Sequence, residues 1–307
     1  MKFGRLENIE HTDFYLPKDH TLNKETFSKL SKKNKTPQVY IGCPVWADKG
    51  FIGKVYPKGT KSSDFLRQYC QQFNSIEVNS THYNIPSITQ VEKWKQQATP
   101  GFIFCPKTPQ FVSHRIELIE KINVMDEFLT HIYELKEHLG PIFIQLPPYY
   151  KPEYTQHLHD FLEVLPSDLS FALELRHEAW FGNTQFEKQL FDLLSHFNTT
   201  YIITDTPGRR DVLHQMITTD KVFIRFLGNN LHPTDYTRID AWIQRLVTWI
   251  DQGINEVYFF MHQPDKHNCA DLAIYMAKQF KNHTGLEIKV PEIIGEQTHS
   301  QSQTLLF

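Results

Sequence analysis

The sequence has few cysteines, no strong charge bias and no hydrophobic run of membrane-spanning length. Its four cysteines are scattered without a CxxC or other metal-ligand spacing, which is typical of reduced thiols in a cytoplasmic protein. The first 20 residues are interrupted by Asp13 and Pro17 and do not resemble a secretory signal. The formal net charge is -3, so the sequence lacks the basic excess of dedicated nucleic-acid binders. A local basic cleft is still compatible with this net charge. We therefore expect a cytoplasmic protein without a membrane partner.

Glycine is missing where a dinucleotide-binding sheet would require it. The first predicted strand runs into IGCPVW and carries no GxGxxG turn, which argues against a doubly wound open sheet. Apolar segments of strand length instead alternate with helical patterns, and this alternation predicts an α/β protein folded as a (β/α)₈ TIM barrel. Only the sixth crossover, residues 207–220, leaves room for little or no helix. The predicted strands are residues 39–43, 75–79, 102–107, 142–146, 171–176, 201–205, 222–228 and 257–262.

The barrel is predicted to form a single domain with polar additions at both ends. Residues 1–38 are polar and lysine-rich, with a weak helical pattern near Phe27 and Leu30, and are interpreted as an N-terminal extension. Residues 39–290 contain the predicted barrel. Residues 291–307 are interpreted as a polar C-terminal tail.

The segment FALELRHEAW, residues 171–180, carries the densest group of chemically active side chains. Strand alternation places Glu174 and Arg176 on one face of a strand that is predicted to be covered on both faces. Charges in such a position need a partner or a chemical role. His177 and Trp180 follow where the strand should end, so the segment predicts half of an active site. The alternative, a buried Glu–Arg pair that only fixes packing, stays open.

Polar residues also stand at the carboxyl ends of the other predicted strands, where TIM-barrel enzymes keep their active sites. A single such residue is more often an internally paired polar group, but the repetition at nearly every strand favours a shared site. The candidate catalytic residues are Glu77, Glu174, His177 and Asp205. The candidate substrate-binding residues are Trp46, Asn79, Tyr83, Lys107, His114, Gln145, Arg176, Trp180, Arg225 and His262.

The cations among these residues predict a ligand with an anionic group. Lys107, Arg176 and Arg225 supply positive charge, and the glycine-containing turns at 208–210 and 228–230 would let backbone amides approach a phosphate. The alternative is that each cation only neutralises Glu77, Glu174 or Asp205, because the number of cations equals the number of carboxylates.

Three aromatic residues are candidates for stacking. Trp46, Tyr83 and Trp180 would suit a flat ligand such as a base or a sugar ring. Aromatic residues are also common core residues, and that interpretation stays open.

No cofactor and no metal are predicted. A divalent ion held by Glu77, Glu174, His177, Asp205 and His262 is a competing interpretation, because carboxylates and imidazoles are common metal ligands. Lysine and arginine side chains in the same cavity would repel the ion, and no His-x-His spacing is present. We therefore prefer a metal-free site.

Eight short motifs follow one another along the predicted barrel, from Tyr40 to Phe280. They are YIG with Trp46, FNSIEVNSTHYNIP, FIFCPK with His114, LGPIFIQLPP, FALELRHEAW, YIITDTPG, VFIRFLG and VYFFMH. In this order they resemble the YecE-like family of TIM-barrel proteins, the domain-of-unknown-function family numbered 72. The resemblance implies a TIM barrel and no particular reaction. It places Glu77, Asn79, Lys107, His114, Gln145, Glu174, Arg176, His177, Asp205 and Arg225 on recurring polar positions of the family.

Two departures from the family pattern fall at the predicted site. Cys43, Pro44 and Val45 precede Trp46, where a glycine, serine and glycine run is usual. His262 and Gln263 stand where an asparagine pair is usual. A ligand inferred for another member therefore does not transfer automatically.

Two functions from different classes are expected from these residues. The first is an enzyme, a hydrolase or lyase acting on a sugar-like or phosphate-bearing substrate, with Glu77 or Glu174 as general acid or base and the cations stabilising negative charge. The second is a non-catalytic protein that binds a nucleotide or single-stranded nucleic acid in the same cleft. The sequence predicts no oligomeric state.

Overall fold

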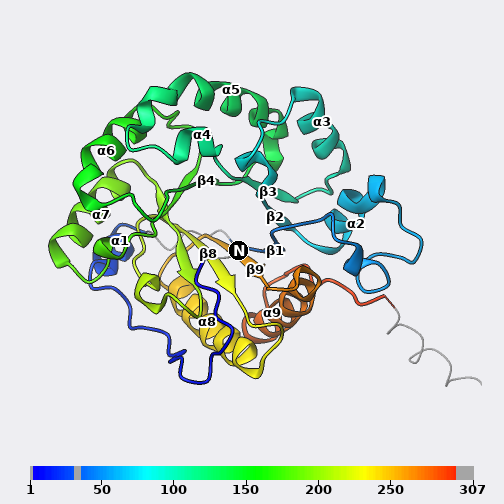
Figure 1. Ribbon diagram of the computed structural model, residues 1–307. Helices are drawn as coiled ribbons and strands as arrows, with labels where there is room; N and C mark the ends of the chain where they lie inside the picture. The colour runs from blue at the N-terminus through cyan, green and yellow to red at the C-terminus, as the bar shows by residue number, and fades with distance from the viewer. Residues whose placement is uncertain (1–2, 31–35, 295–307) are drawn as a thin grey trace, which may run out of the picture.

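The computed structural model describes residues 3–30 and 36–294. Within them, strands lie at the centre and helices surround them (Figure 1). The strands are β1 Gln38–Cys43, β2 Ser75–Val78, β3 Ile103–Pro106, β4 Ile142–Gln145, β5 Phe171–Glu174, β6 Thr200–Tyr201, β7 Ile203–Asp205, β8 Lys221–Leu227 and β9 Glu256–His262. The helices are α1 Asn23–Lys29, α2 Phe65–Gln72, α3 Ile88–Gln97, α4 Gln110–Ser113, α5 Ile122–Ile132, α6 Thr155–Glu163, α7 Thr184–His196, α8 Pro233–Asp251 and α9 Cys269–Thr284.

The strands follow one another around a closed ring. Parallel pairing connects β3-β2-β1-β9-β8-β7 and, separately, β4-β5-β6. β3 meets β4 through the bridge between Lys107 and Phe143, where the N–H of Thr108 donates to the Phe143 carbonyl over 2.9 Å. β6 and β7 are separated only by Ile202, so they continue one another. This order is that of a (β/α)₈ barrel, and the predicted fold class is confirmed.

Strand alternation sorts the apolar side chains into an interior and an outer layer. Phe143, Phe223 and Phe260 belong to a small apolar cluster inside the ring. Ile224 on the outward face of β8 and Leu173 on the outward face of β5 belong to the two larger clusters that pack against the helices. Because both faces of each strand are covered, the strands are nearly continuous apolar runs in the sequence.

The sixth crossover contains no α-helix, as its length predicted. Between β7 and β8 the chain makes one short 3-10 turn, η8 Arg210–Val212. The next crossover holds α8. After β9, α9 ends at Thr284 and is capped by Gly285, which has a left-handed φ of 68°. Glycine is favoured at such a helix end because a Cβ is strained in that conformation.

The first part of the chain packs along the outside of the barrel. Residues 3–20, named the N-terminal strap, pass α8 and lead to α1, which is seen as the dark blue segment in Figure 1. The Phe14 ring lies 4.8 Å from the guanidinium of Arg238, and Arg245 donates to the Pro17 carbonyl over 2.9 Å. Of the predicted additions, residues 1, 2, 31–35 and 295–307 lie outside the described residues. No helix of the described ranges is both long and apolar enough to cross a membrane.

Candidate functional site

A buried ion-pair network joins strands β2, β5 and β8 at their carboxyl ends. Arg225 on β8 donates from Nε to Glu77 Oε2 over 3.0 Å and from Nη2 to Glu77 Oε1 over 2.6 Å. Its Nη1 donates to Glu174 Oε2 on β5. Both carboxylates are fully buried, with 0% of each residue exposed. One guanidinium therefore links two acids across the barrel interior. With the side chains bonded to them, these residues form the mouth network: Glu77, Asn79, Lys107, Gln145, Glu174, Arg176, Arg225 and His262.

Strand alternation explains why these side chains meet. Residues two positions apart share a strand face, and members of the interior apolar cluster stand two positions before most members of the network. The pairs are Cys105 and Lys107, Phe143 and Gln145, Ala172 and Glu174, Phe223 and Arg225, and Phe260 and His262. The mouth network is thus the next layer of inward side chains, at the end where barrel enzymes work.

Lys107 enters the network through Gln145. Lys107 Nζ donates to Gln145 Oε1 over 2.8 Å, and Gln145 Nε2 donates to Glu174 Oε2 over 2.9 Å. Burial of the ammonium, with the positive charge of Arg225 beside it, lowers the pKa of Lys107 to about 7. This amine can therefore gain or lose a proton near neutral pH.

The two carboxylates are held ionised. Burial opposes ionisation of Glu174, but Arg176 and Arg225 outweigh it and lower the pKa of Glu174 to about 2. Arg176 Nε donates to Glu174 Oε1 over 2.7 Å. For Glu77, burial is likewise outweighed, chiefly by Arg225 and His262, and its pKa lies well below the ordinary value. Both acids therefore compensate cations at neutral pH.

Asn79 and His262 complete the surroundings of Glu77. Asn79 Nδ2 lies 2.7 Å from Glu77 Oε1, and His262 Nε2 lies 3.0 Å from Glu77 Oε2. Burial lowers the pKa of His262 to about 4, so the ring is neutral and its Nε2–H is the donor. Its buried Nδ1 has no hydrogen-bond partner among the described residues.

His82 belongs to the same region, although the sequence analysis did not single it out. Its Nδ1 donates to the Thr108 carbonyl over 3.0 Å, which leaves Nε2 as an acceptor. The His82 ring centroid lies 5.0 Å from that of His114. Burial and the charge of Lys107 lower the pKa of His82 to about 4, and they also lower the pKa of His114. Its position just after the second predicted strand is the feature of the sequence that could have marked His82 as a candidate site residue.

Asp205 lies apart from the mouth network. It shares the outer face of β7 with Ile203, so its carboxylate meets α8. Arg238 Nη2 donates to Asp205 Oδ1 over 2.7 Å, and Trp242 Nε1 donates to Oδ2 over 2.8 Å. Arg210 also pairs with this carboxylate. Asp205 therefore anchors α8 to β7. Of the charged candidates at the strand ends, Glu77, Lys107, Glu174, Arg176 and Arg225 converge, and Asp205 does not.

The three predicted stacking residues occupy different settings. Trp180 is buried in an outer cluster, and its Nε1 donates to the Tyr150 carbonyl over 2.7 Å. Trp46 is partly buried and packs edge-on against Trp94. Tyr83 is 60% exposed. Of the three, Tyr83 alone presents an open ring, so the structure does not bring the predicted stacking residues together.

The imidazoles and carboxylates named for the competing metal interpretation form no group of three ligand atoms close to one another in the described residues. His177 Nδ1 accepts the N–H of Ala179 and caps a short 3-10 turn, η7 Glu178–Trp180. In the described ranges, the one group of three ligand atoms within 4.8 Å of one another is His159, Asp160 and Glu163 on α6, outside the network. The metal-free site stays a prediction.

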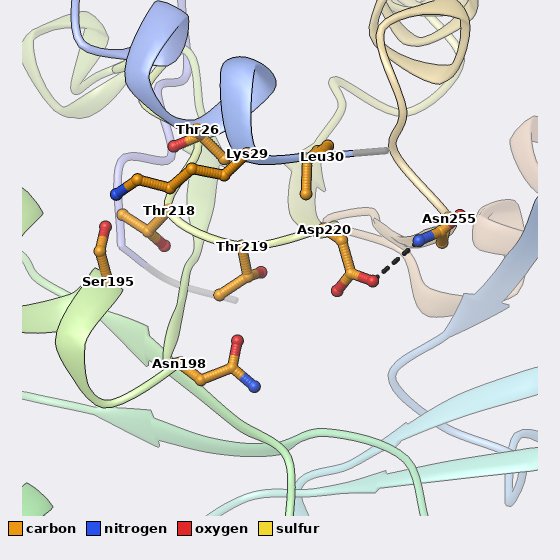
Figure 2. A pocket seen from close by; sticks show the side chains of 9 residues that line it. All are labelled: Thr26, Lys29, Leu30, Ser195, Asn198, Thr218, Thr219, Asp220 and Asn255. Atoms are coloured by element: carbon orange, nitrogen blue, oxygen red, sulfur yellow. Dashed lines mark hydrogen bonds between the residues drawn. The ribbon is translucent and has the colours of Figure 1, made fainter. Parts of the chain in front are cut away.

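A pocket of about 350 Å³ lies at the opposite end of the barrel (Figure 2). It is enclosed between α1 and the segments that precede β8 and β9, where Asn255 Nδ2 donates to Asp220 over 2.8 Å. No member of the mouth network lines this pocket, so the two regions are separate.

Comparison with known proteins assigns the chain to a family. The model of the family described as "Protein of unknown function DUF72" matches residues 40–294. The chain belongs to this family. It is 28% identical over 246 residues to the UPF0759 protein YecE of Escherichia coli (strain K12), covering 74% of this chain and 87% of that protein. It is 28% identical over 204 residues to the UPF0759 protein YunF of Bacillus subtilis (strain 168), covering 62% and 71%.

Solved structures agree with this assignment. A DUF72 family protein of Thermotoga maritima is 25% identical, with a TM-score of 0.63 over 81% of this chain and 100% of that one. A DUF72 family protein of Enterococcus faecalis is 18% identical, with a TM-score of 0.64 over 83% and 99%. All members of the mouth network lie in the matched range 40–294, whereas the N-terminal strap lies before it.

Proposed function

We propose that the protein is an enzyme, a hydrolase or lyase acting on an anionic, sugar-like or phosphate-bearing substrate at the mouth network. The observation that carries this proposal is the place of Lys107, buried at the barrel mouth with its Nζ 2.8 Å from Gln145 Oε1 and bonded through Gln145 to Glu174. These surroundings lower its pKa to about 7, which suits proton transfer at neutral pH. Strongly shifted ionisable groups at the carboxyl end of a barrel favour a catalytic role over a purely structural one.

Lys107 is a better candidate for the acid–base group than either glutamate. Glu77 and Glu174 are both held ionised by Arg225 and accept several hydrogen bonds, so they are weak proton acceptors at neutral pH. The neutral amine of Lys107 would take a proton from an attacking water in a hydrolase, or from a substrate carbon in a lyase. The resulting ammonium would return that proton to the leaving group.

The charges of the network favour an anionic substrate. Arg176 and Arg225 balance Glu77 and Glu174, so protonation of Lys107 adds one uncompensated positive charge. A negative group bound beside it would in turn stabilise the ammonium. Arg176 is partly exposed and would form the edge of the site that meets the substrate.

The alternative, a nucleotide or single-stranded nucleic-acid binding protein, is favoured by one observation. Tyr83 and Tyr149 are 60% and 50% exposed, and the Tyr149 hydroxyl donates to the His114 carbonyl over 2.9 Å, beside His82. Two open rings at the mouth suit base stacking. Binding of single-stranded oligonucleotides that weakens steeply with salt, without turnover of any substrate, would support this alternative.

The decisive experiment compares wild-type protein with Lys107→Met on phosphate esters, glycosides and phosphorylated sugars. We expect the variant to lose about 10²- to 10⁴-fold in kcat, the usual contribution of a general acid or base. Lys221→Met is the matched control, because Lys221 pairs with Glu256 at the start of β8, at the other end of the barrel. Turnover that survives in Lys107→Met would exclude the proposed role.

A second measurement needs no substrate. A small neutral acetylating ester modifies amines only in their neutral form, so the pH dependence of acetylation, mapped by peptide mass spectrometry, reports the pKa of each lysine. We expect Lys107 to titrate near pH 7. Titration of Lys107 near its ordinary value of 10.5 would contradict the proposal.

A further inference from the structure

The N-terminal strap reaches the mouth network through an aromatic ring. The Phe3 ring centroid lies 4.3 Å from the guanidinium carbon of Arg176 and 5.1 Å from that of Arg209. Arg176 also pairs with Glu174, and Arg209 pairs with Asp211. The ring thus covers two cations, one of which is a member of the network.

The backbone beside this ring is held by hydrogen-bond donors of the loop after β7. The Gly4 carbonyl accepts the Gly208 N–H over 2.7 Å and the Thr206 hydroxyl over 2.9 Å. The distance from Gly208 N is at the short end of the usual range for N–H···O hydrogen bonds. Gly4 has a φ of +69°, and a Cβ built on it would lie 1.6 Å from Thr206 Oγ1. Only glycine therefore fits at this contact.

The contact at the mouth is separate from the other attachments of the strap. A cavity of about 600 Å³ lies between the strap and the loop after β7, with Leu6 on one side and Pro207 on the other. Leu6 lies against Gly208 beside this contact, and the strap meets the barrel again at Phe14, whose ring lies 4.8 Å from Arg238 and 5.5 Å from Arg210. The two attachments are separated along the chain, so displacement of residues 3 and 4 does not require the contact of Phe14 with Arg238 to break.

We propose that Phe3 and Gly4 are an internal, displaceable occupant of an oxyanion subsite at the barrel mouth. The groups that hold them are two guanidiniums, a backbone N–H and a hydroxyl, which are the groups that bind a phosphate, sulfate or carboxylate. Such an anion competes with Gly4 for the donors of Thr206 and Gly208 and with the Phe3 ring for Arg176. This inference rests on the proposed function in one respect, that the barrel mouth is the substrate site. It places the anionic group of the substrate beside the loop after β7.

The experiment measures access to the covered arginines. Phenylglyoxal modifies arginine side chains, and peptide mass spectrometry gives the rate at Arg176 and Arg209 relative to exposed Arg67 on α2 in the same molecule. The full-length wild type is compared with Phe3→Ala, which removes the ring, and with Gly4→Ala. Gly285→Ala is the matched control, because Gly285 has nearly the same φ of +68° but no atom within 4 Å of its added Cβ.

We expect Phe3→Ala and Gly4→Ala to raise the relative rate at Arg176 about tenfold, as for a cover that is closed about nine-tenths of the time. Gly285→Ala should match the wild type. Inorganic sulfate should protect Arg176 in the opened variants at concentrations about tenfold lower than in the wild type. Equal rates in wild type, Phe3→Ala and Gly4→Ala would overturn the inference, as would an equal increase in Gly285→Ala. Since no step depends on turnover, a failure of the catalytic role of Lys107 would leave this result unchanged.

Discussion

At the scale of single residues, the buried carboxylate of Glu174 depends on its donors. It accepts Arg176 Nε over 2.7 Å and Gln145 Nε2 over 2.9 Å, and it also pairs with Arg225. Desolvation of an ion is costly, so the pair is tolerated only because these donors replace water. Removing the negative charge of Glu174 leaves the guanidiniums of Arg176 and Arg225 with fewer hydrogen-bond acceptors in a buried place.

Glu174→Gln should therefore lower the free energy of unfolding at pH 7 by about 3–5 kcal/mol, the usual result of breaking a buried ion pair. The folded-state pKa of about 2 lies below the ordinary 4.5, so the contribution of Glu174 is present above 4.5 and is lost as the pH falls toward 2. The variant should thus lose stability less steeply than wild type over that window. Urea unfolding between pH 3 and 7 measures both effects. Glu163→Gln, at an exposed position of α6, is the control; a Glu174→Gln protein as stable as this control would contradict the ion-pair energetics.

Residue alternation also shows how far the site was predictable. Glu77, Glu174 and Arg225 were predicted because they stand at strand ends, and the structure places all three on the inward face. Asp205 stands at a strand end too, but on the face of Ile203, so it pairs with α8. The alternation that places Asp205 on the outward face can be read from the sequence. Its partners Arg238 and Trp242 could not be predicted, because no local pattern gives the position of α8.

At the scale of elements, the N-terminal extension was the least predictable part. Its helical pattern near Phe27 was recognised, and α1 forms there as Asn23–Lys29. Leu16 belongs to the core, and Phe27 and Leu30 pack against it, while Thr26 Oγ1 donates to the Ile217 carbonyl over 2.6 Å. The few apolar residues of this segment predict a short helix, but they do not show which part of the barrel the helix packs against. The strands, whose burial does produce apolar runs, were located correctly.

The docking of α1 predicts a specific loss. Asn23 Nδ2 donates to the Gln215 carbonyl over 2.7 Å, and the N–H of Ile217 donates to Asn23 Oδ1 over 2.8 Å. Asn23→Ala leaves both backbone groups without this partner in a buried place and should cost about 1–3 kcal/mol. Thermal and urea unfolding measure the change. Ser28→Ala, which removes only an exposed hydrogen bond to the Glu25 carbonyl within α1, should stay within about 0.5 kcal/mol of wild type, and an equal loss in both variants would contradict the docking.

At the scale of the whole molecule, the barrel concentrates charge at one end of an apolar interior. Its eight strand positions were predictable because each is a local signal, and the ring order follows from the right-handed crossovers of such folds. The ion pairs between β2, β5 and β8 were not predictable individually, because they join side chains that are far apart in the sequence and depend on ring closure. Closure is also what buries Lys107 and shifts its pKa.

This arrangement predicts that an anion stabilises the whole protein in a pH-dependent way. Below pH 7 Lys107 is an ammonium and the mouth network carries an extra positive charge; above pH 7 the amine is neutral and that charge is lost. Sulfate keeps a constant charge over this range, so its stabilising effect should be larger at pH 6 than at pH 8.5. A tenfold difference in affinity corresponds to about 1.4 kcal/mol of stability at saturating sulfate, or a few degrees in Tm. Thermal unfolding in sulfate, against chloride at equal ionic strength, gives the difference. Lys107→Met should keep the general effect of sulfate on hydration and lose its pH dependence; a dependence that persists in this variant would place the titrating group elsewhere.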